Sequence, residues 1–90
     1  MGDVFITLKI MPTSPDVNLE ELKNRAKKKA EEIGAKIFDL KEEPIAFGLT
    51  AILLTIIWDE NKDPDVVETE MAKVEEVNSI QVTDVRRAIA

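Results

Sequence analysis

The pattern of apolar and polar residues predicts four β-strands, at residues 4–10, 35–43, 48–58 and 78–85. In the first segment, aliphatic residues fall on one side only, at Val4, Ile6, Leu8 and Ile10. This alternation is typical of a strand with one face in a core. The second segment alternates less regularly and is rich in charge, which favours an edge strand. The third is almost entirely apolar, as expected for a strand buried on both faces.

Two other segments follow the helical period. Residues 18–33 carry apolar residues at helical spacing, start with Asn18 as a good N-cap and stop before Gly34, which can end a helix in the left-handed conformation. Glu21, three residues after Asn18, would complete a capping box. A second helix is predicted to begin at Asp63-Pro64, with an inner stripe made by Val67, Met71 and Val74.

The element order is therefore βαββαβ, within a single domain of residues 1–90. Two βαβ halves with right-handed crossovers give a four-stranded antiparallel sheet with both helices on one face. The fold class is α+β, a ferredoxin-like sandwich. The first and third strands are expected to be central, which suits the apolar character of the third.

The third strand has apolar residues on both sides, yet helices cover only one. We expect the bulkier set against the helices: Ile52, Leu54, Ile56 and Trp58. The other set then lies on the uncovered face, beside Phe5 and Thr7 of the first strand: Ala51, Leu53, Thr55 and Ile57. A contiguous apolar patch suggests a partner or self-association, whereas scattered surface apolar residues are normal. Phe5 is expected to be the only aromatic residue on this face.

Composition excludes several kinds of chemistry. The chain has no cysteine and no histidine, so thiolate sites and the usual general base are absent. Four acids, Asp59, Glu60, Asp63 and Asp65, lack the spacing and the glycine of a calcium loop. We therefore expect no catalytic residue, no metal site and no cofactor. A net charge of −6 argues against direct nucleic-acid binding.

Charge is unevenly distributed along the chain. Residues 23–29 contain five bases and no acid, whereas residues 59–76 contain eight acids and two lysines. One interpretation is two solvated helix faces. The other is a bipolar docking surface.

The uncharged run from Pro44 to Trp58 is too short for a membrane helix, which needs about 20 apolar residues. The N-terminus also lacks the basic region of a secretory signal. We expect a cytoplasmic protein that does not enter a membrane.

Three segments together resemble the archaeal elongation factor 1-beta family: MGDVFITLKIMP, EEPIAFGLTAILL and SIQVTDVRRAIA. The resemblance covers nearly the whole chain. It implies a guanine-nucleotide exchange factor, without covalent chemistry, whose partner is elongation factor 1-alpha, the GTPase that carries aminoacyl-tRNA to the ribosome. A monomer or weak self-association is expected. The alternative is a small regulatory or ligand-binding domain that acts through the open sheet face.

The resemblance also indicates a partner-binding tip. In eukaryotic relatives, the phenylalanine of a matching GFG segment contacts the GTPase, which implies the same role for Phe47, flanked by Ala46 and Gly48. Gly48 would let the backbone turn sharply so that the ring projects. The alternative is that Phe47 folds back into the core.

The end of the chain departs from the eukaryotic pattern. Those relatives have a lysine next to the last residue that reaches toward the magnesium and phosphate region, and Ala90 stands at its position here. Arg86 and Arg87 are nearby and would supply positive charge, although arginine differs from lysine in reach and hydration. Alternatively, they are ordinary surface charges.

Overall fold

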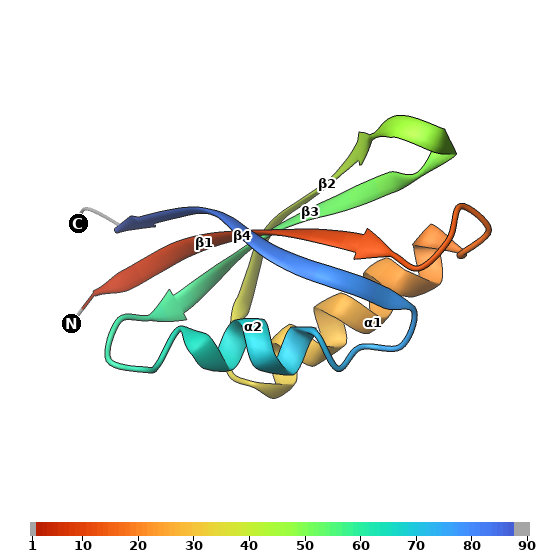
Figure 1. Cartoon of the computed structure of the whole chain (residues 1–90). Helices are drawn as coiled ribbons and strands as arrows, with labels where there is room; N and C mark the ends of the chain where they lie inside the picture. Colours follow the sequence, from red (N-terminus) through yellow and green to blue (C-terminus); the bar gives the residue numbers. More distant parts are fainter. Residues whose placement is uncertain (1, 88–90) are drawn as a thin grey trace.

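The computed structural model describes residues 2–87 and confirms the predicted βαββαβ order (Figure 1). Its elements are β1 (Asp3–Pro12), α1 (Leu19–Glu32), β2 (Lys36–Pro44), the 3-10 turn η1 (Ala46–Gly48), β3 (Thr50–Asp59), α2 (Asp65–Met71) and β4 (Val77–Arg87). The strands form one antiparallel sheet in the order β2-β3-β1-β4. Both helices lie on the same side of this sheet (Figure 1). The fold is thus the α+β ferredoxin-like sandwich, with β1 and β3 central as predicted.

The core lies between the sheet and the two helices. The inward-facing residues of β1 and β3 are buried as predicted, and they meet the apolar stripes of the helices. The largest fully buried side chains are Ile6, Leu8, Ile10, Leu22, Ile52, Leu54, Ile56, Val67 and Met71. Trp58 closes one end of this core at 2% exposure, and Lys62 Nζ lies 5.1 Å from the centroid of its ring.

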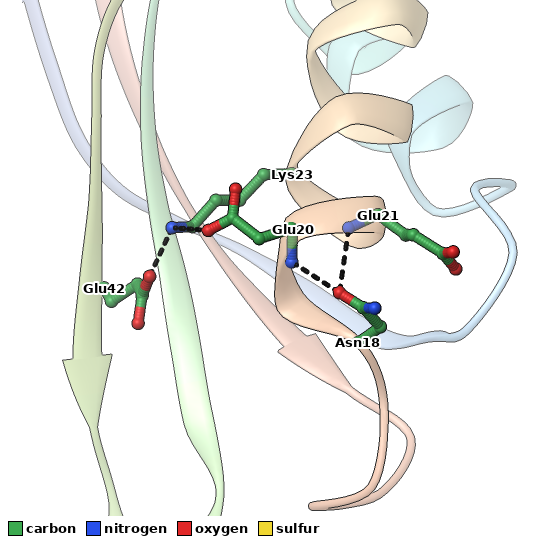
Figure 2. A network of polar contacts seen from close by, with 5 residues as sticks. All are labelled: Asn18, Glu20, Glu21, Lys23 and Glu42. Atoms are coloured by element: carbon green, nitrogen blue, oxygen red, sulfur yellow. Dashed lines mark hydrogen bonds and ion pairs between the residues drawn. The ribbon is translucent and has the colours of Figure 1, made fainter.

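Helix α1 begins and ends where the sequence predicts. The Asn18 side-chain oxygen accepts hydrogen bonds from the backbone N–H groups of Glu20 and Glu21, at 3.0 and 3.3 Å (Figure 2). Gly34 adopts φ 93° just after the helix. Only half of the expected capping box forms, because the Glu21 N–H donates to Asn18 while the Glu21 carboxylate turns to Arg25, 3.2 Å away. An ion pair one helical turn along thus replaces the reciprocal bond to the cap.

Several boundaries differ from the predicted ones by one or two residues; β3, for example, begins at Thr50 rather than at residue 48, because Gly48 belongs to η1. Helix α2 starts at Asp65, with Pro64 as its N-cap, and ends at Met71, so Val74 is buried beyond the helix rather than on its stripe. Strand β4 continues to Arg87, because its last residues pair with the start of β1. The strand therefore includes both arginines of the tail.

The sheet face away from the helices, hereafter the open face, is largely apolar along its central strands. Phe5, Thr7, Leu53, Thr55 and Ile57 are half-buried there, and the Thr7 and Thr55 hydroxyls are hydrogen-bonded at 3.0 Å. Ala51 lies on this side of β3 as predicted, but its side chain is fully buried. A methyl group on a central strand is easily enclosed by longer side chains on both neighbouring strands.

Phe38 is a second aromatic residue on the open face, so the expectation that Phe5 is alone there was wrong. The register between β2 and β3 shifts between Ile37 and Asp39, which marks a β-bulge at Phe38. Such a bulge re-aims a side chain relative to simple alternation. The Phe38 ring stacks on that of Phe5, with centroids 4.8 Å apart, and Phe38 remains 59% exposed.

Three of the five basic residues of α1 form ion pairs with residues of other elements. Lys23 binds the carboxylate of Glu42 on β2 (Figure 2). Arg25 contacts Glu76 at 2.7 Å, and Lys29 contacts Glu70 at 3.3 Å. The hydrogen bond to Glu42 raises the pKa of Lys23, and the one to Glu76 raises the pKa of Arg25. The bases of residues 23–29 and the acids of residues 59–76 thus partly neutralise each other, which neither interpretation of the charge pattern anticipated.

Candidate functional site

The connection between β2 and β3 is a short turn whose backbone is closed by its own hydrogen bonds. The N–H of Ile45 donates to the carbonyl of Leu49 at 2.8 Å, and the N–H of Leu49 donates to the carbonyl of Ala46 at 3.3 Å. These bonds pull the two strand ends together and force the three residues of η1 outward. Ala46, Phe47 and Gly48 therefore form the tip of a hairpin, and all three are exposed.

Phe47 sits at this tip with 94% of its surface exposed, so it does not fold back into the core. Its backbone is left-handed, at φ 63° and ψ 29°. This conformation costs an L-residue about 1–2 kcal/mol, and full exposure of an aromatic ring contributes nothing to the core. The fold has no need of phenylalanine here, and such strain is characteristic of positions kept for function.

Gly48 follows with φ 76°, a second consecutive left-handed residue. A Cβ placed on Gly48 would meet no atom within 4 Å, so backbone conformation rather than space favours glycine at this position. The pair of left-handed residues reverses the chain within the tip and holds the Phe47 ring away from the sheet. The family resemblance implied a projecting ring, with burial of Phe47 as the alternative, and the structure supports projection; nothing in the sequence indicated the strain at Phe47.

The tail arginines belong to the last two positions of β4. Arg86 pairs with Phe5 and Arg87 pairs with Val4, so the two side chains face opposite sides of the sheet. Arg86 Nε lies 2.8 Å from Asp84 Oδ2, and Arg87 Nη2 lies 2.9 Å from Glu60 Oε2. Both arginine side chains are still more than three-quarters exposed. Ala90, at the position of the eukaryotic lysine, lies outside the described residues.

The structure does not bring the tip and the arginines together. The tip precedes Thr50, at the start of β3, whereas Val4 and Phe5 pair with Trp58 and Ile57 at the other end of that strand. Eight residues of strand separate these ends, or about 26 Å at 3.3 Å per residue. Figure 1 shows the β2–β3 turn at one end of the molecule and the end of β4 at the other. The predicted site is thus two separate surfaces.

Two acids of the β3–α2 connection accept hydrogen bonds from backbone N–H groups. Asp59 Oδ1 accepts from the N–H of Asn61, and Asp63 Oδ1 accepts from the N–H of Asp65, both at 2.9 Å. Between residues 2 and 87, no three acids are grouped so that they could hold a metal ion. No helix in that part of the chain is long and apolar enough to span a membrane.

The chain matches the family model described as the EF-1 guanine nucleotide exchange domain over residues 5–88. It belongs to this family of exchange domains. Elongation factor 1-beta of Methanothermobacter thermautotrophicus is 43% identical over 88 residues, covering 97% of this chain and 98% of the relative. Elongation factor 1-beta of Methanobrevibacter smithii is 49% identical over the same length and coverage.

A comparison with solved structures bears on the fold alone. The C-terminal domain of the MgtC protein from Mycobacterium tuberculosis superimposes with a TM-score of 0.63, covering 96% of this chain and 87% of that one. Its sequence identity is 6%, so the likeness carries no function. The exchange-domain assignment therefore depends on the sequence relatives, and the roles of individual residues depend on the geometry described above.

Proposed function

We propose that this exchange domain promotes release of GDP from elongation factor 1-alpha during translation elongation. The proposal is carried by the family match over nearly the whole chain together with a strained, exposed Phe47 at the hairpin tip. A guanine-nucleotide exchange role in translation agrees with the names of the archaeal relatives. The GTPase partner and the individual contacts are the parts of the proposal that require experiment.

Nucleotide exchange requires no covalent chemistry. An exchange factor binds the nucleotide-free GTPase more tightly than the nucleotide-bound form, and by linkage it weakens nucleotide affinity by the same factor. A thousandfold weakening corresponds to about 4 kcal/mol of differential interface free energy. One well-seated aromatic anchor supplies about 2 kcal/mol or more, so Phe47 and a few charged contacts are sufficient.

Phe47 is suited to be this anchor because its conformation is fixed before binding. The turn is closed by the backbone bonds of Ile45 and Leu49, so little conformational entropy is lost when the ring enters a pocket on the partner. Ala46 and Gly48 beside it are small, which allows the partner surface to approach the tip closely. Arg86 and Arg87 supply positive charge at the opposite end of the sheet.

The test is release of a fluorescent GDP analogue from the cognate elongation factor 1-alpha, with the exchange domain at substoichiometric concentration. We expect release to accelerate with the wild-type chain and to fall toward the spontaneous rate with Phe47→Ala. Val66→Ala is a matched control, because it trims another exposed apolar side chain, 40% exposed, on α2. Folded wild-type protein that leaves the release rate unchanged would refute the proposal.

A further inference from the structure

Four rows of side chains run across all four strands of the open face along paired residues, and one further pair, Asp3 and Asp59, lies beyond the first row on the central strands. In order from β2 to β4, the first row is Lys36, Ile57, Phe5 and Arg86, and the second is Asp39, Thr55, Thr7 and Asp84. The third is Lys41, Leu53, Lys9 and Gln81. The fourth consists of the pair Glu43 and Ala51 and the pair Met11 and Ser79, which continue the same register by one step. The charged side chains therefore change sign from row to row: positive, negative, positive, negative.

The middle of each row is apolar or uncharged except at Lys9. The stacked rings of Phe5 and Phe38 form the bulkiest part, at the first row, while the fourth row holds the small residues Ala51 and Ser79. The described helices all lie on the other side of the sheet, so nothing in residues 2–87 covers these rings. An exposed apolar patch with a charged border is typical of an interaction surface.

We propose that the open face binds a second copy of this chain, face to face, with the strands of the two sheets antiparallel. A two-fold axis parallel to the rows generates this arrangement. The axis reverses the row order, so the first row of one copy lies over the fourth row of the other, and the second over the third. Two packed sheets keep their strand directions within about 30° of each other, which this arrangement allows.

Charge complementarity favours this axis. Lys36 then lies over Glu43 of the second copy, and Asp39 lies over Lys41 of the second copy. Lys9, the one charge on a central strand within these four rows, lies over Thr7 of the second copy, one strand away from Asp84 of that copy. Lys36, Lys41 and Lys9 thus each have an anion of the second copy within reach, whereas Arg86 lies over Ser79 and keeps the ion pair with Asp84 of its own chain.

Packing favours the same axis. Ile57 and the Phe5 ring lie over Ala51 and Met11 of the second copy, so bulky side chains meet a small one and a flexible one. Interlocking large and small side chains is how stacked sheets fill the space between them. The opposite choice, an axis parallel to the strands, places each row over itself. It would set cations against cations and acids against acids at both edges of the sheet, and like charges at close range oppose association.

The size of the face sets the strength of the association. Four strands about 4.8 Å apart and six residues along β3 give a patch of about 19 Å by 20 Å. Such a small area belongs with weak, transient interfaces, so the pair should form reversibly at high concentration. The tip with Phe47 lies beyond the fourth row and stays free. The association can therefore be tested without the exchange function, although Arg86 of the first row belongs to both proposals.

Sedimentation equilibrium of the wild-type chain, from micromolar to millimolar concentration, is the first measurement. We expect the mean mass to rise toward that of two chains, with concentration-dependent NMR shifts confined to open-face amides such as those of Phe5, Thr7 and Leu53. Higher salt should weaken the association, because charge pairs contribute to it. A mass of one chain throughout this range would overturn the proposal.

Charge reversal tests the geometry. Lys41→Glu should weaken association at least tenfold, because the introduced carboxylate would face Asp39 of the second copy, whereas the swap Asp39→Lys with Lys41→Glu should restore it. Lys28→Glu, the same charge change on α1 behind the sheet, is the control and should have no comparable effect. Phe38→Ala, which removes an exposed ring, should also weaken association while leaving thermal unfolding little changed.

The same variants distinguish other occupants of the face. If the swap does not restore association, the antiparallel axis is wrong. If an oligonucleotide or elongation factor 1-alpha shifts the open-face amides while the free chain shows no concentration dependence, the face serves a different partner and self-association is refuted.

Discussion

Lys29 of α1 and Glu70 of α2 form an ion pair between the two helices, with Nζ 3.3 Å from Oε1. Glu70 also accepts from Lys73, whose Nζ lies 2.8 Å from its other oxygen. The hydrogen bond from Lys73, followed by that from Lys29, holds the pKa of Glu70 below its ordinary value of 4.5. The one carboxylate thus links two helices that share few other contacts, and its protonation should be visible in stability.

The first prediction follows from this pKa. A carboxylate with a lowered pKa in the folded state contributes stability above its unfolded pKa and loses it as pH falls through the folded value. Glu70→Gln should therefore lower the free energy of unfolding at neutral pH, and the difference from wild type should shrink below pH 4.5. Urea unfolding followed by Trp58 fluorescence at several pH values measures this. Glu31→Gln, on an exposed site of α1, is the control, and an equal pH profile for both variants would contradict the prediction.

The second prediction separates strain from function at Phe47. Phe47→Gly should raise the free energy of unfolding by about 1 kcal/mol, because glycine adopts the left-handed conformation without penalty. Phe47→Ala keeps that backbone cost and should leave stability nearly unchanged, since the ring is 94% exposed. Both variants should lose most exchange activity. A large loss of stability in Phe47→Ala with normal exchange would mean that the ring supports the fold instead.

The third prediction compares two glycines in left-handed conformations. Gly48→Ala should cost about 1 kcal/mol and also slow exchange, because the strained turn would misdirect the neighbouring ring. Gly34→Ala, at φ 93° after α1, should cost a similar amount because of its backbone conformation, since the 2.5 Å approach of its Cβ to Lys62 Nζ is relieved when that flexible side chain moves. That site is remote from the tip, so exchange per folded molecule should be normal. Similar exchange rates for the two variants would exclude a positioning role for Gly48.

The fourth prediction concerns Arg86 and Arg87. Because their side chains face opposite sides of the sheet, at most one points toward a given partner surface, so Arg86→Ala and Arg87→Ala should slow exchange unequally. Each forms only an exposed ion pair, so either change should cost less than about 1 kcal/mol of stability. The sensitive variant should also lose part of the salt dependence of association. If even the double variant promotes GDP release at the wild-type rate at low salt, both arginines are ordinary surface charges.

Much of the fold follows from local pattern. Residues 4–10 and residues 18–33 each have one apolar face to bury. The spacing of their apolar residues therefore determines the type of element and which of its sides faces the core. Asn18 and Gly34 mark the ends of α1 because their preferences act within a few residues. The break between Pro44 and Gly48 was also predictable, whereas the exposure of Phe47 was expected only from the family resemblance, with a place in the core as the alternative.

The features that the sequence did not reveal depend on contacts between distant segments. The bulge at Phe38 is defined by pairing with β3, so alternation within β2 alone does not indicate it. The Glu21 carboxylate had two suitable partners, the backbone N–H of Asn18 and the guanidinium of Arg25. It binds Arg25, whose side chain is held in place by its ion pair with Glu76. The continuation of β4 through Arg87 likewise depends on the start of β1. Charge runs in sequence say little about which charges pair across a fold.

The separation of Phe47 from the arginines makes the sheet a spacer of fixed length in a molecule that measures 41 Å along its longest axis. A partner that engages both ends would be held bivalently: once one end is bound, the other faces its target at a high effective concentration. Disabling both ends would then cost less binding free energy than the sum of the losses from disabling each end alone. The reason is that loss of either end already removes the avidity of two-point binding. Inserting a residue pair into β2 and β3 would lengthen the spacer and disrupt two-point binding while leaving each contact intact.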